Sequence, residues 1–129
     1  MITAILNRNE HLHYYQGFHD FISVFLLTLG PNLGFYCAEQ ASKFFIADFC
    51  METFETGVFP ALDLSNKLLS LIDADLWELI EEQGGQPTFA LSWFLTWFSH
   101  DVESISKVQQ VFDACLSTHP LFCVYIVVA

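Results

Sequence analysis

One stretch of the chain, residues 88–99 (TFALSWFLTWFS), is apolar on nearly every side when it is drawn as a helix. After Thr88 at its start, its only hydroxyl side chains are Ser92, Thr96 and Ser99, which form a narrow polar stripe. A helix with so little polar surface is stable in water only when other elements surround it. We therefore expect this helix at the centre of a multi-helix bundle.

The flanking segments repeat apolar residues at helical spacing, and glycine or proline separates them. Residues 1–8 are expected to be the last turns of a helix, and the next helix begins at Phe18 or Asp20 and stops at Gly30-Pro31. The next expected helix covers Phe35–Met51, and another stretch starts at Pro60, breaks near Asp73–Asp75 and ends at Gly84-Gly85. A helix over residues 88–99 has Pro87 in its first turn. A further helix is marked by the apolar positions Ile105, Val108, Phe112, Cys115 and Leu116, and Pro120 opens the last one. No alternation of strands with helices and no internal repeat is visible, so the predicted fold is all-α. A strand over Phe122–Val128 stays open as an alternative, because Val, Tyr and Ile also favour sheets.

Two of these segments carry charged residues whose placement can be predicted. In Phe35–Met51, one face is expected to be buried and to hold Ala38, Ala41, Phe44, Phe45 and Phe49. The charged residues Glu39, Lys43 and Asp48 are expected to point elsewhere. The acidic residues Asp73, Asp75, Glu78, Glu81 and Glu82 are expected to form a solvated helix face. Their spacing alone selects no pair of carboxylates for hydrolytic catalysis.

The charge balance limits the kinds of partner. Four Lys and Arg oppose 15 Asp and Glu, which gives a formal net charge of −11, so the chain repels phosphate backbones and nucleic-acid binding is not expected. A basic or amphipathic partner fits better, because opposite charge speeds encounter. With 53% hydrophobic residues and fourteen Phe, the chain has the material for a large core.

The four cysteines, Cys37, Cys50, Cys115 and Cys123, lack any close-paired spacing such as CxxC. Three of them stand among apolar neighbours, where a thiol acts as a small hydrophobic group, so buried free thiols and a reducing compartment are expected. No secretory signal is present, and the runs FISVFLLTL and LFCVYIVVA are each too short for the ~18 residues of a membrane helix. The chain ends inside the second run, so we expect it to be a truncated piece.

Three blocks of sequence, in order, resemble the TBC domain of Rab GTPase-activating proteins. In NRNEHLHYYQGFHDF, residues Tyr14, Gln16, Gly17 and Asp20 occupy the YxQGxxD positions of that family. FALSWFLTWFSHD resembles its tryptophan-containing central helix, especially in the endoplasmic-reticulum-associated branch, and Val111-Phe112-Asp113 stands at its "rlWD" position. The resemblance covers the whole chain but only the middle of the family's domain. It implies that residues 1–129 are an incomplete TBC domain, without the upstream arginine-motif region and the C-terminal helices.

The resemblance implies a regulator of a Rab-family GTPase in vesicle-mediated transport rather than an enzyme with its own substrate. In the family, the YxQG glutamine orients the hydrolytic water, and Gln16 fits that role as the catalytic residue. Tyr14, Tyr15, Gly17 and Asp20 would be the GTPase-binding residues. No cofactor is implied in this chain, since the GTPase would carry GTP and magnesium.

A second family residue has no counterpart here. An arginine from an upstream IxxDxxR motif would stabilise charge on the transferred phosphoryl group. The only arginine of the chain, Arg8, lies in RNEHL and does not match that motif. We therefore expect the chain alone to be nearly inactive.

Simpler interpretations stand beside these. Tyr14 and Tyr15 can pack the loop, and capping of the following helix is the favoured role for Asp20. His11, His13 and His19 gather near Glu10 and Asp20, but the second Glu-x-x-His that a di-iron bundle needs is absent, so no metal is predicted. Trp93 and Trp97, four residues apart, are expected in the core.

Two other functions stay open. The chain can be a non-catalytic helical module that binds a GTPase or an effector, or an incompletely folded piece whose exposed apolar ends favour aggregation. By resemblance, the chain is expected in the cytoplasm, with its parent protein at the endoplasmic reticulum or Golgi membrane.

Overall fold

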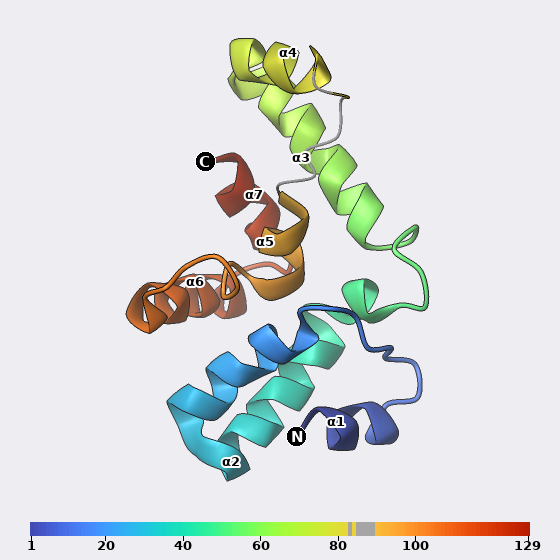
Figure 1. Ribbon diagram of the computed structural model, residues 1–129, viewed down its shortest axis with the longest axis vertical. Coiled ribbons are helices and arrows are strands. Elements are labelled where there is room, and N and C mark those ends of the chain that lie inside the picture. The colour runs from blue at the N-terminus through green and yellow to red at the C-terminus, as the bar shows by residue number, and fades with distance from the viewer. Residues whose placement is uncertain (83, 85–89) are drawn as a thin grey trace.

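The computed structural model describes residues 1–82, 84 and 90–129 as an elongated array of helices (Figure 1). Its elements, in chain order, are α1 (Ile2–Arg8), α2 (Phe18–Phe44), the 3-10 helix η1 (Ala47–Cys50), α3 (Val58–Ile72), α4 (Ala74–Glu82), α5 (Ala90–Thr96), α6 (Ile105–Ser117) and α7 (Phe122–Val128). The described residues contain no strand, so the all-α prediction is confirmed and the segment from Phe122 to Val128 is a helix.

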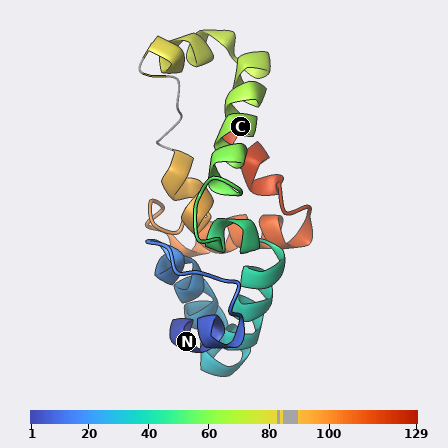
Figure 2. The ribbon, with the colours of Figure 1, turned by 90° about the vertical axis from the view of Figure 1, so that its right-hand side faces the viewer.

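Helix α5 lies in the middle of the array, as its sequence predicts. It contacts α2, α3 and α7, and both views place it between the α2 end and the α4 end of the molecule (Figures 1 and 2). Ala90, Phe94 and Leu95 are buried there. The expected N-terminal part of this helix, Thr88 and Phe89, lies outside the described residues, as do Gly85 and Pro87.

The C-terminal end of α5 corrects the predicted boundary at residue 99. The helix ends at Thr96, because Trp97 and Phe98 are left-handed, with φ of 47° and 66°. The N–H of Phe98 donates to the carbonyl of Trp93 at 3.3 Å, the six-to-one bond that closes many helices. Glycine is the usual residue in such a conformation, and bulky residues adopt it at a cost. The left-handed turn places Trp97 in the core, where its side chain is completely inaccessible to solvent.

Helix α2 is a hairpin of two helical arms. Gly30 has φ 73° and ψ 178°, outside the helical region, and Pro31 follows it, as the predicted stop at Gly30-Pro31 requires. The arms touch at Gly34, where an added Cβ would lie 2.6 Å from the carbonyl oxygen of Phe25. The second arm then runs back beside the first to Phe44 (Figure 1).

By length and composition, α2 could cross a membrane. It has 27 residues, and its most apolar window of 18 residues has a mean hydropathy of 1.5, with a third of that window buried. The sequence prediction considered shorter apolar runs, of which FISVFLLTL lies in the first arm of α2. Because the helix turns back at Gly30, neither arm alone reaches the ~20 residues of a spanning helix, and buried core helices share this composition.

The second arm of α2 corrects two predicted placements. Phe44 is 64% exposed, whereas Glu39 is buried at 4%. The Glu39 carboxylate accepts hydrogen bonds from Arg8 Nε at 2.8 Å and from Asn9 Nδ2 at 3.2 Å. These partners, Arg8 foremost, hold the pKa of Glu39 below its ordinary value, against the opposing effect of burial. A charged residue on the core side is tolerated because the last residue of α1, Arg8, and the residue after it, Asn9, supply its partners.

The remaining helices follow their sequence signals. Asp73 separates α3 from α4, and its Oδ1 accepts a hydrogen bond from the N–H of Leu76 at 3.0 Å, as an N-cap does. Helix α4 has no buried residue, and its acidic face is exposed as predicted. In α6, Val108, Phe112 and Cys115 are buried, also as predicted.

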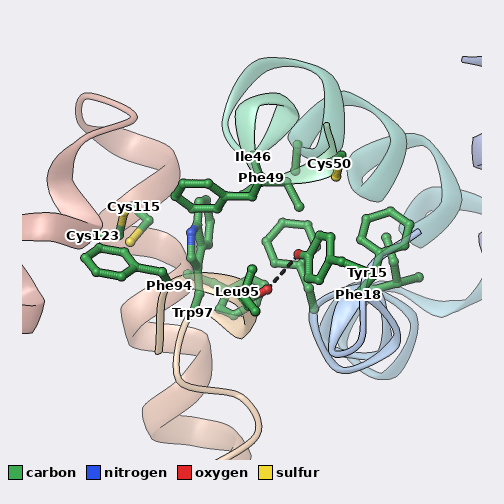
Figure 3. Close-up of a cluster of buried hydrophobic side chains, with 14 of the residues drawn as sticks. Tyr15, Phe18, Ile46, Phe49, Cys50, Phe94, Leu95, Trp97, Cys115 and Cys123 are labelled. Carbon is green, nitrogen blue, oxygen red and sulfur yellow. Dashed lines mark hydrogen bonds between the residues drawn. The ribbon is translucent and has the colours of Figure 1, made fainter. Parts of the chain in front are cut away.

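An aromatic cluster around Trp97 joins α2, the turn after α5, and α6. The Trp97 ring lies 5.1 Å from the ring centres of Phe21 and Phe112 and 6.1 Å from that of Phe45. Figure 3 shows Trp97 beside Phe94 in this core. The prediction that Trp97 is a core residue is confirmed, and Trp93 is partly buried and stacks on Phe98.

Candidate functional site

The loop between α1 and α2 is held against the centre of the array at several points. The N–H of His13 donates to the carbonyl of Cys50 at 2.6 Å, and Leu12 is buried. Tyr15 is only 5% exposed, and its hydroxyl donates to the carbonyl of Leu95 in α5 at 2.6 Å (Figure 3). Burial raises the pKa of Tyr15 well above its ordinary value, so the hydroxyl keeps the proton that it donates.

Gly17 allows this loop to turn tightly into α2. Its φ is 108°, and an added Cβ would lie 3.0 Å from Cγ2 of Thr96. Glycine takes that conformation without strain, and a larger residue would also press against the Thr96 methyl group. The neighbouring Gln16 is exposed and makes no hydrogen bond within the described part of the chain. The same turn that buries Gly17 therefore presents the Gln16 carboxamide to solvent.

Gln16 borders a pocket of about 520 Å³. Its lining residues are Gln16, Gly17, His19, Asp20, Phe54, Leu91, Ser92, Leu95, Thr96 and His100. Apolar side chains from α5 and from the segment before α3 meet polar groups from the start of α2 and the turn after α5. No Lys or Arg is among these lining residues.

One polar contact joins the two sides of this pocket, and two others lie on its α2 side. Asp20 Oδ2 lies 3.0 Å from His100 Nδ1, and Asp20 Oδ1 lies 3.5 Å from His19 Nε2. The Tyr14 hydroxyl is 3.3 Å from His19 Nδ1. The sequence offers no local signal for His100 as a site residue, since it stands 80 positions from Asp20.

The capping role predicted for Asp20 is wrong. Gly17 is the N-cap of α2, and no side chain caps that end. Asp20 lies in the first turn, where its negative charge is favoured by the helix dipole, but its carboxylate faces the two histidines.

The residues predicted for the site divide into two groups. Gln16 and Tyr14 are exposed, Tyr14 at 54%, whereas Tyr15 and Gly17 are buried. Asp20 is partly exposed and lines the pocket. Tyr15 and Gly17 therefore hold the loop, and the surface next to the pocket consists of Tyr14, Gln16 and Asp20.

Arg8 is not part of this pocket. Its guanidinium is bound to Glu39 and lies 5.8 Å from the ring centre of Phe35, on the second arm of α2. Arg8 is therefore engaged elsewhere, in agreement with its mismatch to the arginine motif.

The cysteines and histidines form no cluster suited to a metal. Among the described residues, no three His, Cys, Asp or Glu side chains gather closely enough to hold an ion. All four cysteines are free thiols, and Cys50, Cys115 and Cys123 are buried, as predicted. Burial raises the pKa of Cys50 and of Cys115 to about 12 and that of Cys123 to about 11.

Comparison with known proteins gives one family and several relatives. The family model of the Rab-GTPase-TBC domain matches residues 1–129. TBC1 domain family member 20 of Bos taurus is 35% identical over 128 residues, which cover 97% of this chain and 31% of the relative. GTPase-activating protein gyp10 of Schizosaccharomyces pombe is 35% identical over 125 residues, which cover 97% of this chain and 33% of the relative. GTPase-activating protein GYP8 of Saccharomyces cerevisiae is 25% identical over 146 residues, which cover 91% of this chain and 29% of the relative. The chain thus spans about a third of the length of these relatives.

Proposed function

The chain belongs to the Rab-GTPase-TBC domain family, and on that premise we propose that it stimulates GTP hydrolysis by a Rab-family small GTPase. Two of its relatives are named GTPase-activating proteins. In this proposal the GTPase brings GTP and magnesium, and the chain contributes Gln16 to the partner's active site. It acts on vesicle traffic from the cytoplasmic side of the membrane.

The observation that supports this role is the exposure of Gln16 beside the pocket, on a loop held from behind by Tyr15 and Gly17. Phosphoryl transfer needs little covalent help from a protein, and its catalysis consists mainly of positioning and electrostatic stabilisation. A carboxamide suits the positioning task, because its oxygen accepts a hydrogen bond from water and its nitrogen donates one. Gln16 holds the attacking water in line with the γ-phosphate.

The charge-stabilising part of the reaction is not supplied by this pocket. Its lining has no Lys or Arg, and Arg8 is bound to Glu39. An arginine supplied in trans accelerates hydrolysis roughly 10³–10⁵-fold, which corresponds to about 4–7 kcal/mol of transition-state stabilisation. The 129-residue chain by itself is therefore a weak activator. The absence of Lys and Arg from the pocket lining also favours a second candidate function, a module that binds a GTPase without accelerating hydrolysis.

A chimera separates the two candidates. Residues 1–129 replace the matching stretch of gyp10, and phosphate release from a panel of GTP-loaded Rab proteins is followed in single turnover. We expect the chimera to accelerate hydrolysis and Gln16→Ala to lower the rate about tenfold or more, the effect of losing one transition-state hydrogen bond. Gln40→Ala removes an exposed glutamine amide on the second arm of α2 and serves as the matched control.

Either of two results would contradict the activator role of Gln16. An active chimera that keeps its rate after Gln16→Ala would place catalysis elsewhere. A chimera that binds GTP-loaded Rab without any acceleration would establish the non-catalytic binding module instead.

A further inference from the structure

We propose that His100 is a positioning residue, which holds Gln16 in its working orientation through Asp20 and Thr96. This inference rests on the proposed function. Two long-range bonds bracket Gln16 in the sequence, one from Tyr15 to Leu95 and one between Asp20 and His100. Each joins groups 80 residues apart, and both reach the segment from Leu95 to His100.

The turn after α5 connects His100 to Gly17 by a second route. The N–H of His100 donates to Thr96 Oγ1 at 3.4 Å, and Thr96 Oγ1 donates to the carbonyl of Ser92 at 2.8 Å. The other branch of the same side chain, Cγ2 of Thr96, lies close to Gly17, where an added Cβ would be 3.0 Å from it. Thr96 therefore touches both the backbone of His100 and the residue that follows Gln16.

The core fixes the position of this turn. Trp97 is fully buried and packs on Phe21, which follows Asp20 directly in α2. The left-handed conformations of Trp97 and Phe98 aim the chain so that His100 arrives opposite Asp20. A strained backbone of this kind persists only where its surroundings over-determine it, and such strain is concentrated at functional sites.

The exposure of the pair shows why its contribution is to geometry. The side chain of Asp20 is 24% exposed and that of His100 is 63% exposed. Ion pairs with this much solvent contribute little to global stability, because water screens them and ordering the side chains costs entropy. A displacement of about 1 Å in a catalytic group, by contrast, can lower a rate about a hundredfold. Loss of His100 should therefore change the rate far more than the thermal unfolding midpoint.

Hydrogen exchange of the 129-residue chain tests the bond without any GTPase. We compare the wild type with His100→Ala and with His100→Asn, whose amide can donate from nearly the position of Nδ1. His11→Ala is the control, because it removes an exposed histidine from the loop that carries Gln16. We expect His100→Ala to speed amide exchange over residues 16–20 about tenfold while the unfolding midpoint moves by less than about 4 °C. His100→Asn should restore most of the protection, and His11→Ala should leave it unchanged. Unchanged exchange in His100→Ala would overturn the inference.

Single-turnover hydrolysis by the gyp10 chimera tests whether the bond acts through Gln16. We expect His100→Ala to lower the rate at saturation by about ten- to a hundredfold with little change in the apparent KM. In the Gln16→Ala background, His100→Ala should have no further effect, because residues that act as a unit are not additive. Additive effects, or a rise in KM alone, would show that His100 contacts the partner directly and would overturn the proposal. If Gln16→Ala itself has no effect, the proposed function fails, and the exchange comparison still decides whether His100 holds the loop.

Discussion

Adjacent residues of the YYQG tetrad have opposite environments. Tyr14 is 54% exposed, Tyr15 is 5% exposed and Gln16 is exposed again. The loop achieves this because the Tyr15 hydroxyl is bound to Leu95 and Gly17 lies against Thr96. Orientation of the Gln16 amide therefore depends on two neighbours that are themselves buried.

Removal of each tyrosine hydroxyl in turn tests this division of roles. Tyr15→Phe should destabilise the chain by about 1 kcal/mol, because it removes a buried hydrogen bond to the Leu95 carbonyl. Tyr14→Phe should change the free energy of unfolding by less than about 0.5 kcal/mol, since the Tyr14 hydroxyl is at the surface. Urea unfolding monitored by circular dichroism measures both changes. Equal losses from the two substitutions would contradict the anchoring role of Tyr15.

At the scale of elements, the close contact between the two arms of α2 positions the site. The first arm begins at the Gln16-Gly17 turn and carries Asp20. The second arm carries Glu39, which binds Arg8 at the end of α1 and Asn9 at the start of the loop. Gly34 lets the arms approach to backbone distance at Phe25. The hairpin therefore fixes both ends of the loop that presents Gln16.

Substitution of Gly34 tests the close contact between the arms through the sign of the change in stability. In an open helix, Gly→Ala is stabilising by about 1 kcal/mol. Gly34→Ala should instead destabilise by about 1–3 kcal/mol, because the new methyl group would meet the Phe25 backbone, which cannot rotate away. Chemical denaturation measures the difference, with Asn32→Ala as an exposed control in the same arm. A stabilised Gly34→Ala variant would show that the arms are not packed this closely.

At the scale of the whole molecule, the α2 hairpin lies at one end of the array and α4 at the other, with α5 between them (Figures 1 and 2). Buried thiols are distributed over three separate elements of this array: Cys50 in η1, Cys115 in α6 and Cys123 in α7. Because the pKa of each is raised to about 11 or 12, almost none is thiolate near neutral pH. Each should react only when its surroundings open.

Thiol labelling can therefore show whether the array unfolds as one unit. In native protein at pH 8, we expect Cys37, which is only partly buried, to react first and the other three to react slowly with one common opening free energy. That value should match the free energy of unfolding from urea, and a Cys37→Ser background simplifies the measurement. Clearly faster labelling of Cys50 than of Cys115 and Cys123 would show that the α2 end opens independently.

Local patterns in the sequence were sufficient for much of this protein. Helical periodicity and the Gly30-Pro31 and Asp73–Asp75 breaks predicted the all-α class and most helix boundaries, because both act over one or two turns. The same holds for the central position of α5, which follows from its lack of polar surface. The motif around Gln16, with a glycine at the turn, indicated the candidate site.

Only the tertiary structure decided how charged and aromatic groups are paired across long sequence separations. Asp20 faces His100 instead of capping α2, and Glu39 is buried against Arg8. Helix α5 stops at Thr96, and the left-handed Trp97 that follows it is fully buried in the core. Each outcome depends on which groups meet after the chain has folded, and no local spacing encodes a contact between residues 30 or 80 positions apart. Local sequence therefore determined the helices and the exposed glutamine, and packing determined the surroundings that hold that glutamine in place.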